Sequence, residues 1–222
     1  MLTCVLIPAF NEERYIRSVI RKIKAQKIDV IVVDDGSRDN TASAVIEESA
    51  VLIKHPCNKG KGAALRSGFR LVLDKGYDIV ITMDADGQHD PDEIPRFLEK
   101  SRDGGAGIII GNRMHSPRGM PAARIFCNTY GSKITSKAAR QYIPDALIGY
   151  KLIKSDVLKA IELESDRYEI DPEMLIKASL AGFKIDHINI ECIYGSHVSR
   201  IRPLVDGYCF LRMVRRSSRK EK

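Results

Sequence analysis

Cysteine is scarce and unpaired in this sequence. Five cysteines are spread over 222 residues, and no two of them form a Cys-x-x-Cys pair. This usage favours reduced thiols in a cytoplasmic protein. His55 and Cys57 lie close together, but no second ligand pair accompanies them, so we interpret both as structural or loop residues and not as zinc ligands.

Long hydrophobic runs are also missing. No apolar stretch reaches the roughly 18 residues that span a bilayer. The apolar run over residues 2–7 follows no basic segment and precedes no small-residue cleavage site, so we expect a first strand there and not a signal peptide. We therefore expect a protein that is not integral to a membrane. No Pro/Ser-rich linker, repeat or low-complexity tract occurs, which predicts one domain over residues 1–202 with an extension over 203–222.

Two nucleotide-binding motifs are absent as well. The P-loop spacing Gly-x-x-x-x-Gly-Lys-Ser/Thr does not occur, and no Gly-x-Gly-x-x-Gly follows the first expected strand. The second absence argues against a dinucleotide-binding dehydrogenase. Since no RNA-binding signature or aromatic-interleaved basic stripe is present, we expect no nucleic-acid partner.

The composition is typical of a soluble globular protein, with 44% hydrophobic and 29% charged residues. The net charge is +7, and basic residues cluster near the end of the chain. These are Arg215, Arg216, Arg219, Lys220 and Lys222. Such a cluster suits lipid head groups or other anionic partners, and a solvated disordered tail is the alternative.

Short apolar runs alternate with helix-like segments in the first half. We expect strands over residues 3–7, 29–33, 51–53, 78–83 and 107–110, and helices over 12–25, 41–48, 62–74 and 91–100. This alternation predicts an α/β fold with a mostly parallel, Rossmann-like central sheet flanked by helices. In the second half we expect helices over 122–139, 155–161 and 172–181, a strand over 184–193 and an amphipathic end over 203–215.

The most informative motif is Asp84-Ala85-Asp86, which follows the apolar run over residues 79–81. Residues two apart on a strand point to the same side, so both carboxylates could reach one divalent cation or one ion-bound diphosphate. A plain polar turn at a strand end is the alternative.

Three more polar clusters follow expected strands, over residues 8–13, 34–41 and 58–62. A parallel sheet places all four clusters on one edge, where they can build a single cleft. Asp34 and Asp35 could accept hydrogen bonds from a base or a ribose, although Asp34 could also cap its turn. The glycine-rich, basic segment 58–62 at a helix start favours anions through backbone N–H groups and the helix dipole.

These clusters resemble the motifs of the family 2 glycosyltransferases, most closely the dolichyl-phosphate mannose or glucose synthases and the polyprenyl-phosphate glycosyltransferases. The motifs are Ile7-Pro8-Ala9-Phe10-Asn11-Glu12-Glu13, Val32-Val33-Asp34-Asp35-Gly36-Ser37, Asn58-Lys59-Gly60-Lys61-Gly62-Ala63 and Met83-Asp84-Ala85-Asp86-Gly87-Gln88-His89. The resemblance continues more weakly through Gly111-Asn112-Arg113, residues 145–151, residues 168–173 and Ser199-Arg200.

The resemblance implies a GT-A fold and a nucleotide-diphospho-sugar donor. It places the nucleoside among Pro8, Phe10, Glu12, Asp34 and Asp35, with Lys61, Ala85 and Gln88 as further donor-site residues. It makes Asp84 and Asp86 the ligands of Mg²⁺ or Mn²⁺, and Asp86 also a catalytic residue. A metal that bridges both phosphates neutralises the charge on the leaving nucleoside diphosphate.

The acceptor side is predicted less specifically. A phosphate acceptor is already ionised, so its positioning by cations matters more than a general base. The candidate cations are Arg113, Arg124, Arg200 and Arg202, of which the family motifs favour Arg113, as a catalytic and binding residue, and Arg200. A hydroxyl acceptor would need a base, and the candidates are Asp171 and Glu169, unless Asp171 only caps the helix that begins near Pro172.

We therefore expect a metal-dependent inverting glycosyltransferase that moves a hexose from a GDP- or UDP-sugar to a polyprenyl (dolichyl) phosphate. The alternative is the same chemistry on a soluble acceptor, a phosphoglycerate or a saccharide hydroxyl. A sugar-phosphate nucleotidyltransferase would need a glycine-rich, arginine-bearing loop after the first strand, which is absent. A non-catalytic nucleotide-sugar-binding protein would be expected to lack Asp84 or Asp86.

Two departures from the family pattern concern the acceptor. Residues 145–151 lack the Thr or Ser and the second Gly often seen in this segment, and the chain lacks the C-terminal transmembrane helices of many relatives. We therefore expect a cytoplasmic protein, peripheral on the cytoplasmic membrane face, with Tyr208, Phe210, Leu211, Met213 and the basic tail as an interfacial anchor. The same apolar residues could instead pack in the core or in a homodimer.

Overall fold

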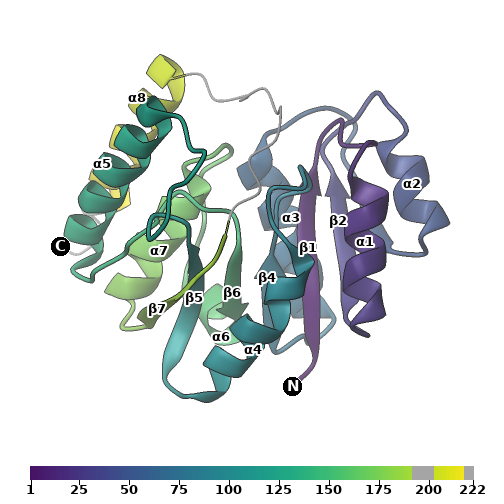
Figure 1. The fold of residues 1–222 in the computed structure, drawn as a ribbon, viewed down its shortest axis with the longest axis horizontal. Coiled ribbons are helices and arrows are strands. Elements are labelled where there is room, and N and C mark those ends of the chain that lie inside the picture. The colour runs from purple at the N-terminus through teal and green to yellow at the C-terminus, as the bar shows by residue number, and fades with distance from the viewer. Residues whose placement is uncertain (192–202, 218–222) are drawn as a thin grey trace.

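The computed structural model describes residues 1–191 and 203–217. Within these ranges seven strands form one sheet in the order β3-β2-β1-β4-β6-β5-β7 (Figure 1). The strands are β1 (Thr3–Ala9), β2 (Asp29–Asp34), β3 (Val51–Lys54), β4 (Ile79–Thr82), β5 (Ala106–Asn112), β6 (Lys151–Lys154) and β7 (Lys184–Asn189). β6 runs antiparallel to its neighbours β4 and β5, and the other pairs are parallel.

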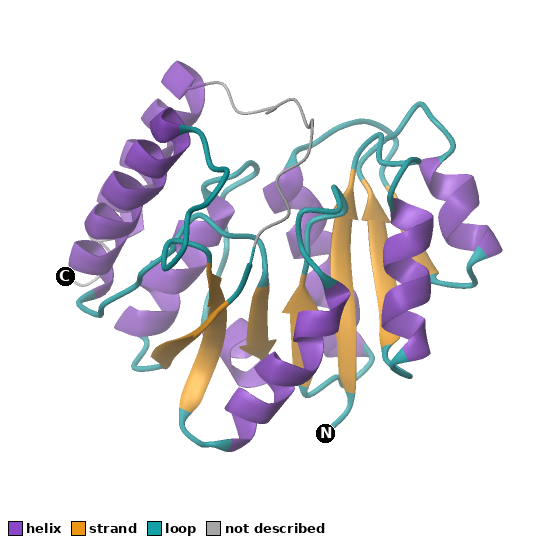
Figure 2. Cartoon of the chain, viewed as in Figure 1, coloured by secondary structure: helices purple, strands orange, loops and turns teal. Residues whose placement is uncertain are grey.

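The helices cover both faces of the sheet. They are α1 (Ile16–Ala25), α2 (Thr41–Glu47), α3 (Lys61–Asp74), α4 (Ile94–Arg102) after the short 3-10 helix η1 (Pro91–Glu93), α5 (Ala122–Ala139), α6 (Ser155–Ala160), α7 (Ile170–Leu180) and α8 (Pro203–Ser217). One face carries α1 and α4, and the opposite face carries α3, α6 and α7 (Figure 2). α5 and α8 both pack against α7.

The core lies between these layers and follows from the continuous apolar runs of the strands. Strands buried on both faces need side chains that are apolar in both directions, and the side chains of residues 4–7 of β1 are fully buried. The expected α/β fold with a mostly parallel central sheet is therefore confirmed. Since β1 to β4 run parallel, their carboxyl ends share one edge of the sheet.

The main difference from expectation is β6, which we did not predict. Its four residues begin and end with lysine, so they show no strand pattern, and the strand exists because it pairs with β4 and β5. The first helix begins at Ile16 and not at residue 12, because the chain first makes a turn in which the Glu12 carbonyl accepts the N–H groups of Tyr15 and Ile16. β7 ends at Asn189, before the expected end at residue 193.

The last helix, α8, is amphipathic as expected, and it packs on the domain through part of the predicted anchor. Met213 is buried, and Phe210 packs partly buried against the core, whereas Tyr208 and Leu211 are exposed. Arg216 contacts Glu173 of α7 at 3.1 Å. In the parts of the chain that the structure describes, no helix combines the length and apolarity needed to cross a bilayer.

Candidate active site

The loops after β1 and β2 are joined at the shared edge of the sheet. The backbone N–H of Asn11 donates to Ser37 Oγ at 2.9 Å, and the Asn11 side chain accepts the N–H of Arg38 at 2.8 Å. The N–H of Glu12 donates to Thr41 Oγ1 at 2.9 Å. These contacts fix the two loops as one wall.

A pocket of about 570 Å³ opens beside this wall. It is lined by Phe10, Gly36, Ser37, Arg38, Lys54, His55, Pro56, Cys57 and Asn58. These residues come from the ends of β1, β2 and β3, so the pocket lies where open α/β sheets bind their ligands. The Phe10 ring in this lining offers a stacking surface for a planar group.

Asp34 lies at the end of β2 and is fully buried. Its Oδ1 accepts the N–H of Ser37 at 2.9 Å, which is the turn capping expected as one alternative. Its Oδ2 has no hydrogen-bond partner among the described residues. A buried carboxylate oxygen without a partner is costly, and a bound hydroxyl or N–H group would satisfy it.

Asp35 binds other parts of the protein, and these contacts change our interpretation of the segment 58–62. Its carboxylate accepts the backbone N–H groups of Lys59 and Gly60, at 3.0 Å and 2.8 Å, and contacts His55 Nδ1 at 2.7 Å. The segment 58–62 therefore does bind an anion, but that anion is the carboxylate of Asp35. The expectation that these backbone N–H groups are open to a ligand is wrong. His55, whose Nε2 contacts Ser67 at 2.9 Å, is a structural residue as expected.

The start of α3 is closed in a similar way. The N–H groups of Gly62 and Ala63 donate to the carbonyl of Asp166, at 2.8 Å and 3.2 Å. A Cβ atom at residue 62 would overlap the carbonyl oxygen of Ser165. Arg66 of α3 binds the Ser165 carbonyl and the Asp166 carboxylate. The glycines of this motif thus permit close packing of segment 165–166 on the helix start.

Four charged side chains meet at the end of β4. Lys61 Nζ lies 2.7 Å from Asp84 Oδ1 and 3.0 Å from Asp171 Oδ2. The other oxygen of Asp171 binds Lys151 of β6, whose side chain is fully buried. Gly149 closes this cluster, because a Cβ there would overlap Asp84 Oδ2 and lie 2.6 Å from Lys61 Nζ.

The close pairing shifts pKa values in opposite directions. Burial would raise the pKa of Asp84, but the ammonium of Lys61 outweighs it and holds this pKa well below its ordinary value. Burial would lower the pKa of Lys61, but the carboxylates of Asp171 and Asp84 raise it above its ordinary value. Asp84 and Lys61 are therefore both charged at neutral pH. Burial lowers the pKa of Lys151, against the attraction of Asp171.

The turn after Asp84 is ordered by its own side chains. Asp86 Oδ1 accepts the N–H of Gln88 at 3.0 Å. The N–H of Asp84 donates to His89 Nδ1 at 3.2 Å, and burial lowers the pKa of His89, so the ring is neutral and can accept this bond. Behind it, the His89 ring packs on Tyr150 with centroids 5.1 Å apart.

The carboxylates of Asp84 and Asp86 fit a divalent cation whose remaining ligands come from a bound substrate. Across the residues that the structure describes, no three His, Cys, Asp or Glu side chains gather as a complete metal site. Mg²⁺ typically binds through one or two carboxylates together with substrate phosphates and water. The hard oxygen donors of Asp84 and Asp86, at one strand end, match that requirement.

Arg113 lies at the end of β5 in a bidentate ion pair. Its Nε and one terminal nitrogen bind the carboxylate of Asp145 at 2.8 Å and 3.0 Å, and both side chains are buried. The positive charge of Arg113 adds to burial in lowering the pKa of His89. Its predicted role toward a phosphate group remains a prediction.

The other predicted residues divide into three groups. Pro8 lies near the end of β1, and Ala85 and Gln88 lie buried in the turn that follows β4. Glu169 precedes α7 and has a buried Oε2 without a hydrogen-bond partner among the described residues. Arg200 and Arg202 lie outside the described residues. No side-chain cap from Asp171 is present on α7; this carboxylate pairs with the two lysines instead.

Sequence reasoning missed the partners that hold the cluster. Lys151 and Gly149 belong to the segment 145–151, which we had noted for a weaker resemblance to the family and for its departures from it, without a role for either residue. Asp145 was noted only as part of that segment and Asp166 was not singled out, since each acts through a contact with a residue distant in sequence.

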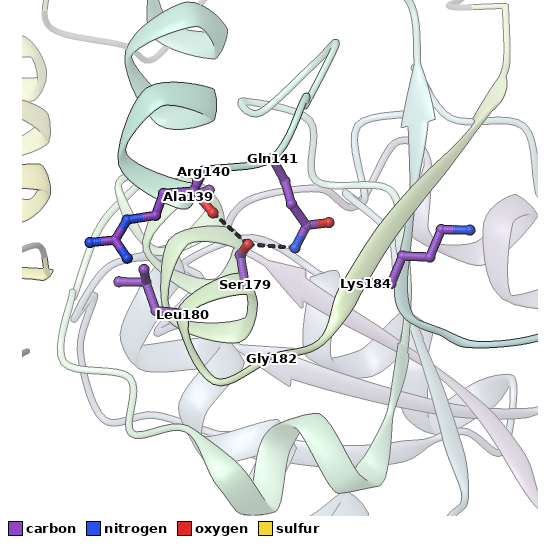
Figure 3. A pocket seen from close by; sticks show the side chains of 7 residues that line it. All are labelled: Ala139, Arg140, Gln141, Ser179, Leu180, Gly182 and Lys184. Atoms are coloured by element: carbon purple, nitrogen blue, oxygen red, sulfur yellow. Dashed lines mark hydrogen bonds between the residues drawn. The ribbon is translucent and has the colours of Figure 1, made fainter.

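A second pocket, of about 370 Å³, lies away from this cluster, where α5, α7 and the start of β7 meet (Figure 3). The amide of Gln141 donates to Ser179 Oγ at 2.5 Å and to the Phe183 carbonyl at 2.9 Å, and Ser179 donates to the Ala139 carbonyl at 2.6 Å. These polar groups hydrogen-bond to one another, so we interpret this pocket as part of the structural contact between α5, α7 and β7.

The mostly parallel sheet and its flanking helices match the GT-A fold. The glucosyl-3-phosphoglycerate synthase of Mycobacterium tuberculosis, solved with Mn²⁺, UDP and glucosyl-3-phosphoglycerate, shares this fold. Its structure matches 97% of this chain and 77% of its own with a TM-score of 0.72, at 21% sequence identity.

Sequence comparison identifies the family. Residues 4–161 match the model of glycosyl transferase family 2, and this chain belongs to that family and is a glycosyltransferase. It is 32% identical to the UDP-N-acetylglucosamine–dolichyl-phosphate N-acetylglucosaminyltransferase of Methanococcus voltae, over 87% of this chain and 86% of that protein. It is also 32% identical to the undecaprenyl-phosphate mannosyltransferase of Micrococcus luteus, over 86% of this chain and 83% of that protein.

Proposed function

We propose that this glycosyltransferase moves a hexose-type sugar from a UDP- or GDP-sugar to a polyprenyl phosphate, with inversion at the anomeric carbon. The observation that carries the proposal is the meeting of Asp84, Lys61 and Asp171 at a strand end that shares its sheet edge with the pocket at Phe10. A nucleoside in that pocket would direct its diphosphate toward this charged cluster.

The reaction breaks one bond and forms one. An acceptor phosphate oxygen attacks the anomeric carbon, and the bond from that carbon to the diphosphate oxygen breaks, with its electron pair leaving on the nucleoside diphosphate. When bound, Mg²⁺ or Mn²⁺ held by Asp84 and Asp86 would neutralise charge on the leaving group. Lys61 supplies a further positive charge at the same place, and Arg113 is a candidate to hold a phosphate.

The state of Asp171 favours a phosphate acceptor over a hydroxyl. One oxygen of Asp171 binds Lys61 and the other binds Lys151. Both oxygens are therefore already engaged by ammonium groups, which makes Asp171 a poor candidate to take the proton that a hydroxyl acceptor must lose and leaves Glu169 as the other candidate base. A phosphate acceptor needs no such base, because it is already ionised at neutral pH. The names of the two relatives, which act on dolichyl and undecaprenyl phosphates, support the same acceptor class.

A lipid acceptor requires a surface that meets the membrane, and we propose α5 together with α8 for it. Phe126, Tyr130 and Ile134 recur every four residues on α5 and are exposed. The rings of Phe126 and Tyr130 pack with centroids 4.3 Å apart, and Lys133 Nζ lies 5.5 Å from the centroid of the Tyr130 ring.

The charges of α5 suit an anionic lipid surface. The helix contains no Asp or Glu, and its charged residues are Arg124, Lys133 and Lys137. α8 adds exposed Val205, Tyr208 and Leu211. Apolar and aromatic side chains beside basic ones are the composition of helices that lie in the membrane interface. We therefore propose a cytoplasmic protein that binds the cytoplasmic membrane face peripherally.

The test is transfer of radiolabel from UDP-GlcNAc, UDP-glucose and GDP-mannose, with Mn²⁺, in the presence of polyprenyl phosphate. Organic-extractable label from one donor is the expected result and names the sugar. Consumption of a donor without extractable label would instead indicate a soluble acceptor, such as a phosphoglycerate or a saccharide. The Asp86→Asn variant, which loses a proposed metal ligand, is the negative control.

A further inference from the structure

Lys61 holds the same carboxylate that the proposed function assigns to a divalent cation. Its Nζ is 2.7 Å from Asp84 Oδ1, and the Lys61 side chain is only 13% exposed. Asp171 fixes the ammonium from the other side at 3.0 Å. A carboxylate oxygen that already accepts a charge-assisted hydrogen bond is a weak ligand for a second cation, because the two cations repel and compete for the same lone pairs.

Neighbouring groups restrict the movement of Asp84 away from this contact. Gly149 lies so close to Asp84 Oδ2 and Lys61 Nζ that there is no room for even a methyl group at residue 149. The backbone N–H of Asp84 is held by His89, which fixes the start of the carboxylate side chain. Asp84 can therefore offer Oδ1 to a metal ion only if Lys61 gives up its hydrogen bond to that oxygen.

We propose that Lys61 is a stand-in cation, which neutralises Asp84 while the donor site is empty and turns to the donor diphosphate when nucleotide and metal bind together. This inference rests on the proposed function and adds an order of binding to it. The divalent cation binds weakly to the protein alone and tightly only in the presence of a nucleoside diphosphate, whose negative charge draws Lys61 away from Asp84.

The experiment measures Mn²⁺ binding to the full chain by electron paramagnetic resonance, without nucleotide, with UDP and with GDP, each corrected for Mn²⁺ bound by nucleotide alone. In the wild-type protein we expect one nucleotide to strengthen Mn²⁺ binding about 10-fold or more. Lys61→Met should bind Mn²⁺ without nucleotide about 10-fold more tightly than the wild type and gain much less from nucleotide.

The matched control is Lys59→Met, two residues earlier in the same loop. It removes the same unit of charge, but Lys59 is an exposed residue, so its Mn²⁺ binding should follow the wild type in all three conditions. Circular dichroism checks that each variant is folded, and Lys61→Gln replaces Lys61→Met if the latter is not.

Two results would overturn the inference alone. One is wild-type Mn²⁺ binding that is equally tight with and without nucleotide, a result that needs no variant. The other is Mn²⁺ binding by Lys61→Met that equals the binding by both the wild type and Lys59→Met. Absence of Mn²⁺ binding in every condition, with nucleotide present, would overturn the proposed metal-dependent function together with this inference.

Discussion

Lys151 of β6 and Asp171 of α7 form an ion pair in which the two side chains are 0% and 4% exposed. This pair joins the antiparallel strand in the middle of the sheet to the first turn of α7. Since the second oxygen of Asp171 binds Lys61, the pair also sets the position of the ammonium that meets Asp84.

The first prediction concerns the stability that this pair provides. Lys151→Met should lower the free energy of unfolding by about 3 kcal/mol, because removing one partner leaves a buried carboxylate short of its compensating charge. Urea unfolding at pH 7 measures this change. Lys154→Met is the control, since Lys154 lies on the same strand but is partly exposed. A loss for Lys151→Met no larger than that of the control would show that the pair adds little.

The second prediction concerns the space at Gly149. Gly149→Ala should lower kcat by about 100-fold, because the new Cβ displaces Asp84 and Lys61 from their positions. The measurement is glycosyl transfer at saturating donor, together with a thermal melt to show that the variant folds. Gly207→Ala is the matched control, since a Cβ at residue 207 meets no atom within 4 Å. Equal activities of the two variants would contradict this role of Gly149.

The third prediction is a pH dependence at Glu173, which is buried at the contact of α7 with α8. Burial would raise the pKa of Glu173, but bonds from Lys177 and from the N–H of Ser165 lower it below its ordinary value. A depressed folded-state pKa stabilises the fold above the unfolded pKa of about 4.3, and this contribution disappears as the pH falls through the folded value.

The stability gap between the wild type and Glu173→Gln should therefore be large at pH 7 and shrink as the pH falls below about 4. Urea unfolding across this pH range measures the gap. Glu99→Gln, at an exposed position of α4, should show no comparable gap at any pH. A gap for Glu173→Gln that stays constant down to acidic pH would mean that the lost stability does not come from ionisation.

The sequence predicted the parallel part of the fold well because its signals are local. The runs 4–7 and 79–81 are apolar throughout, and strands of that kind must be buried on both faces. Asp84 and Asp86 were located by the same logic, as carboxylates at the end of such a strand. β6 escaped prediction because Lys151 is polar and its strand is defined by distant partners.

The roles of the site residues depend on contacts that no local pattern contains. From the sequence alone, Asp35 was a candidate to bind a base or a ribose. In the folded chain it accepts hydrogen bonds from Lys59 and Gly60. Asp171 fitted a general base or a helix cap, and it pairs with Lys61 and Lys151 instead. Each of these partners lies 20 or more residues away in sequence, so only the folded chain brings them together.

The fourth prediction tests the nucleotide pocket through Asp34. Since Asp34 Oδ2 is buried and lacks a partner among the described residues, a bound nucleoside should supply one. Asp34→Asn should weaken binding of UDP or GDP by about 10-fold, because an amide replaces a charged acceptor. Isothermal titration calorimetry measures the affinity. Asp103→Asn, an exposed position before β5 at the opposite edge of the sheet, is the control. Unchanged affinity for both variants would separate Asp34 from the nucleotide site.

The last prediction concerns the exposed face of α5. A double variant, Phe126→Ser with Tyr130→Ser, should bind anionic vesicles of phosphatidylglycerol and phosphatidylcholine about 10-fold more weakly, because two aromatic side chains no longer enter the interface. Vesicle sedimentation measures binding, and Ile46→Ser, which removes an exposed apolar side chain from α2, is the control.

The same double variant should keep its activity on a short, water-soluble prenyl phosphate, because the substitutions lie on the helix surface and outside the charged cluster at Asp84. Activity lost equally on short and long acceptors would mean that α5 supports the site itself. Wild-type protein that fails to bind vesicles but elutes as a dimer, with the double variant eluting as a monomer, would instead assign this face to a second copy of the chain. Vesicle binding that weakens with added salt would support the basic residues of α5 as part of the same contact.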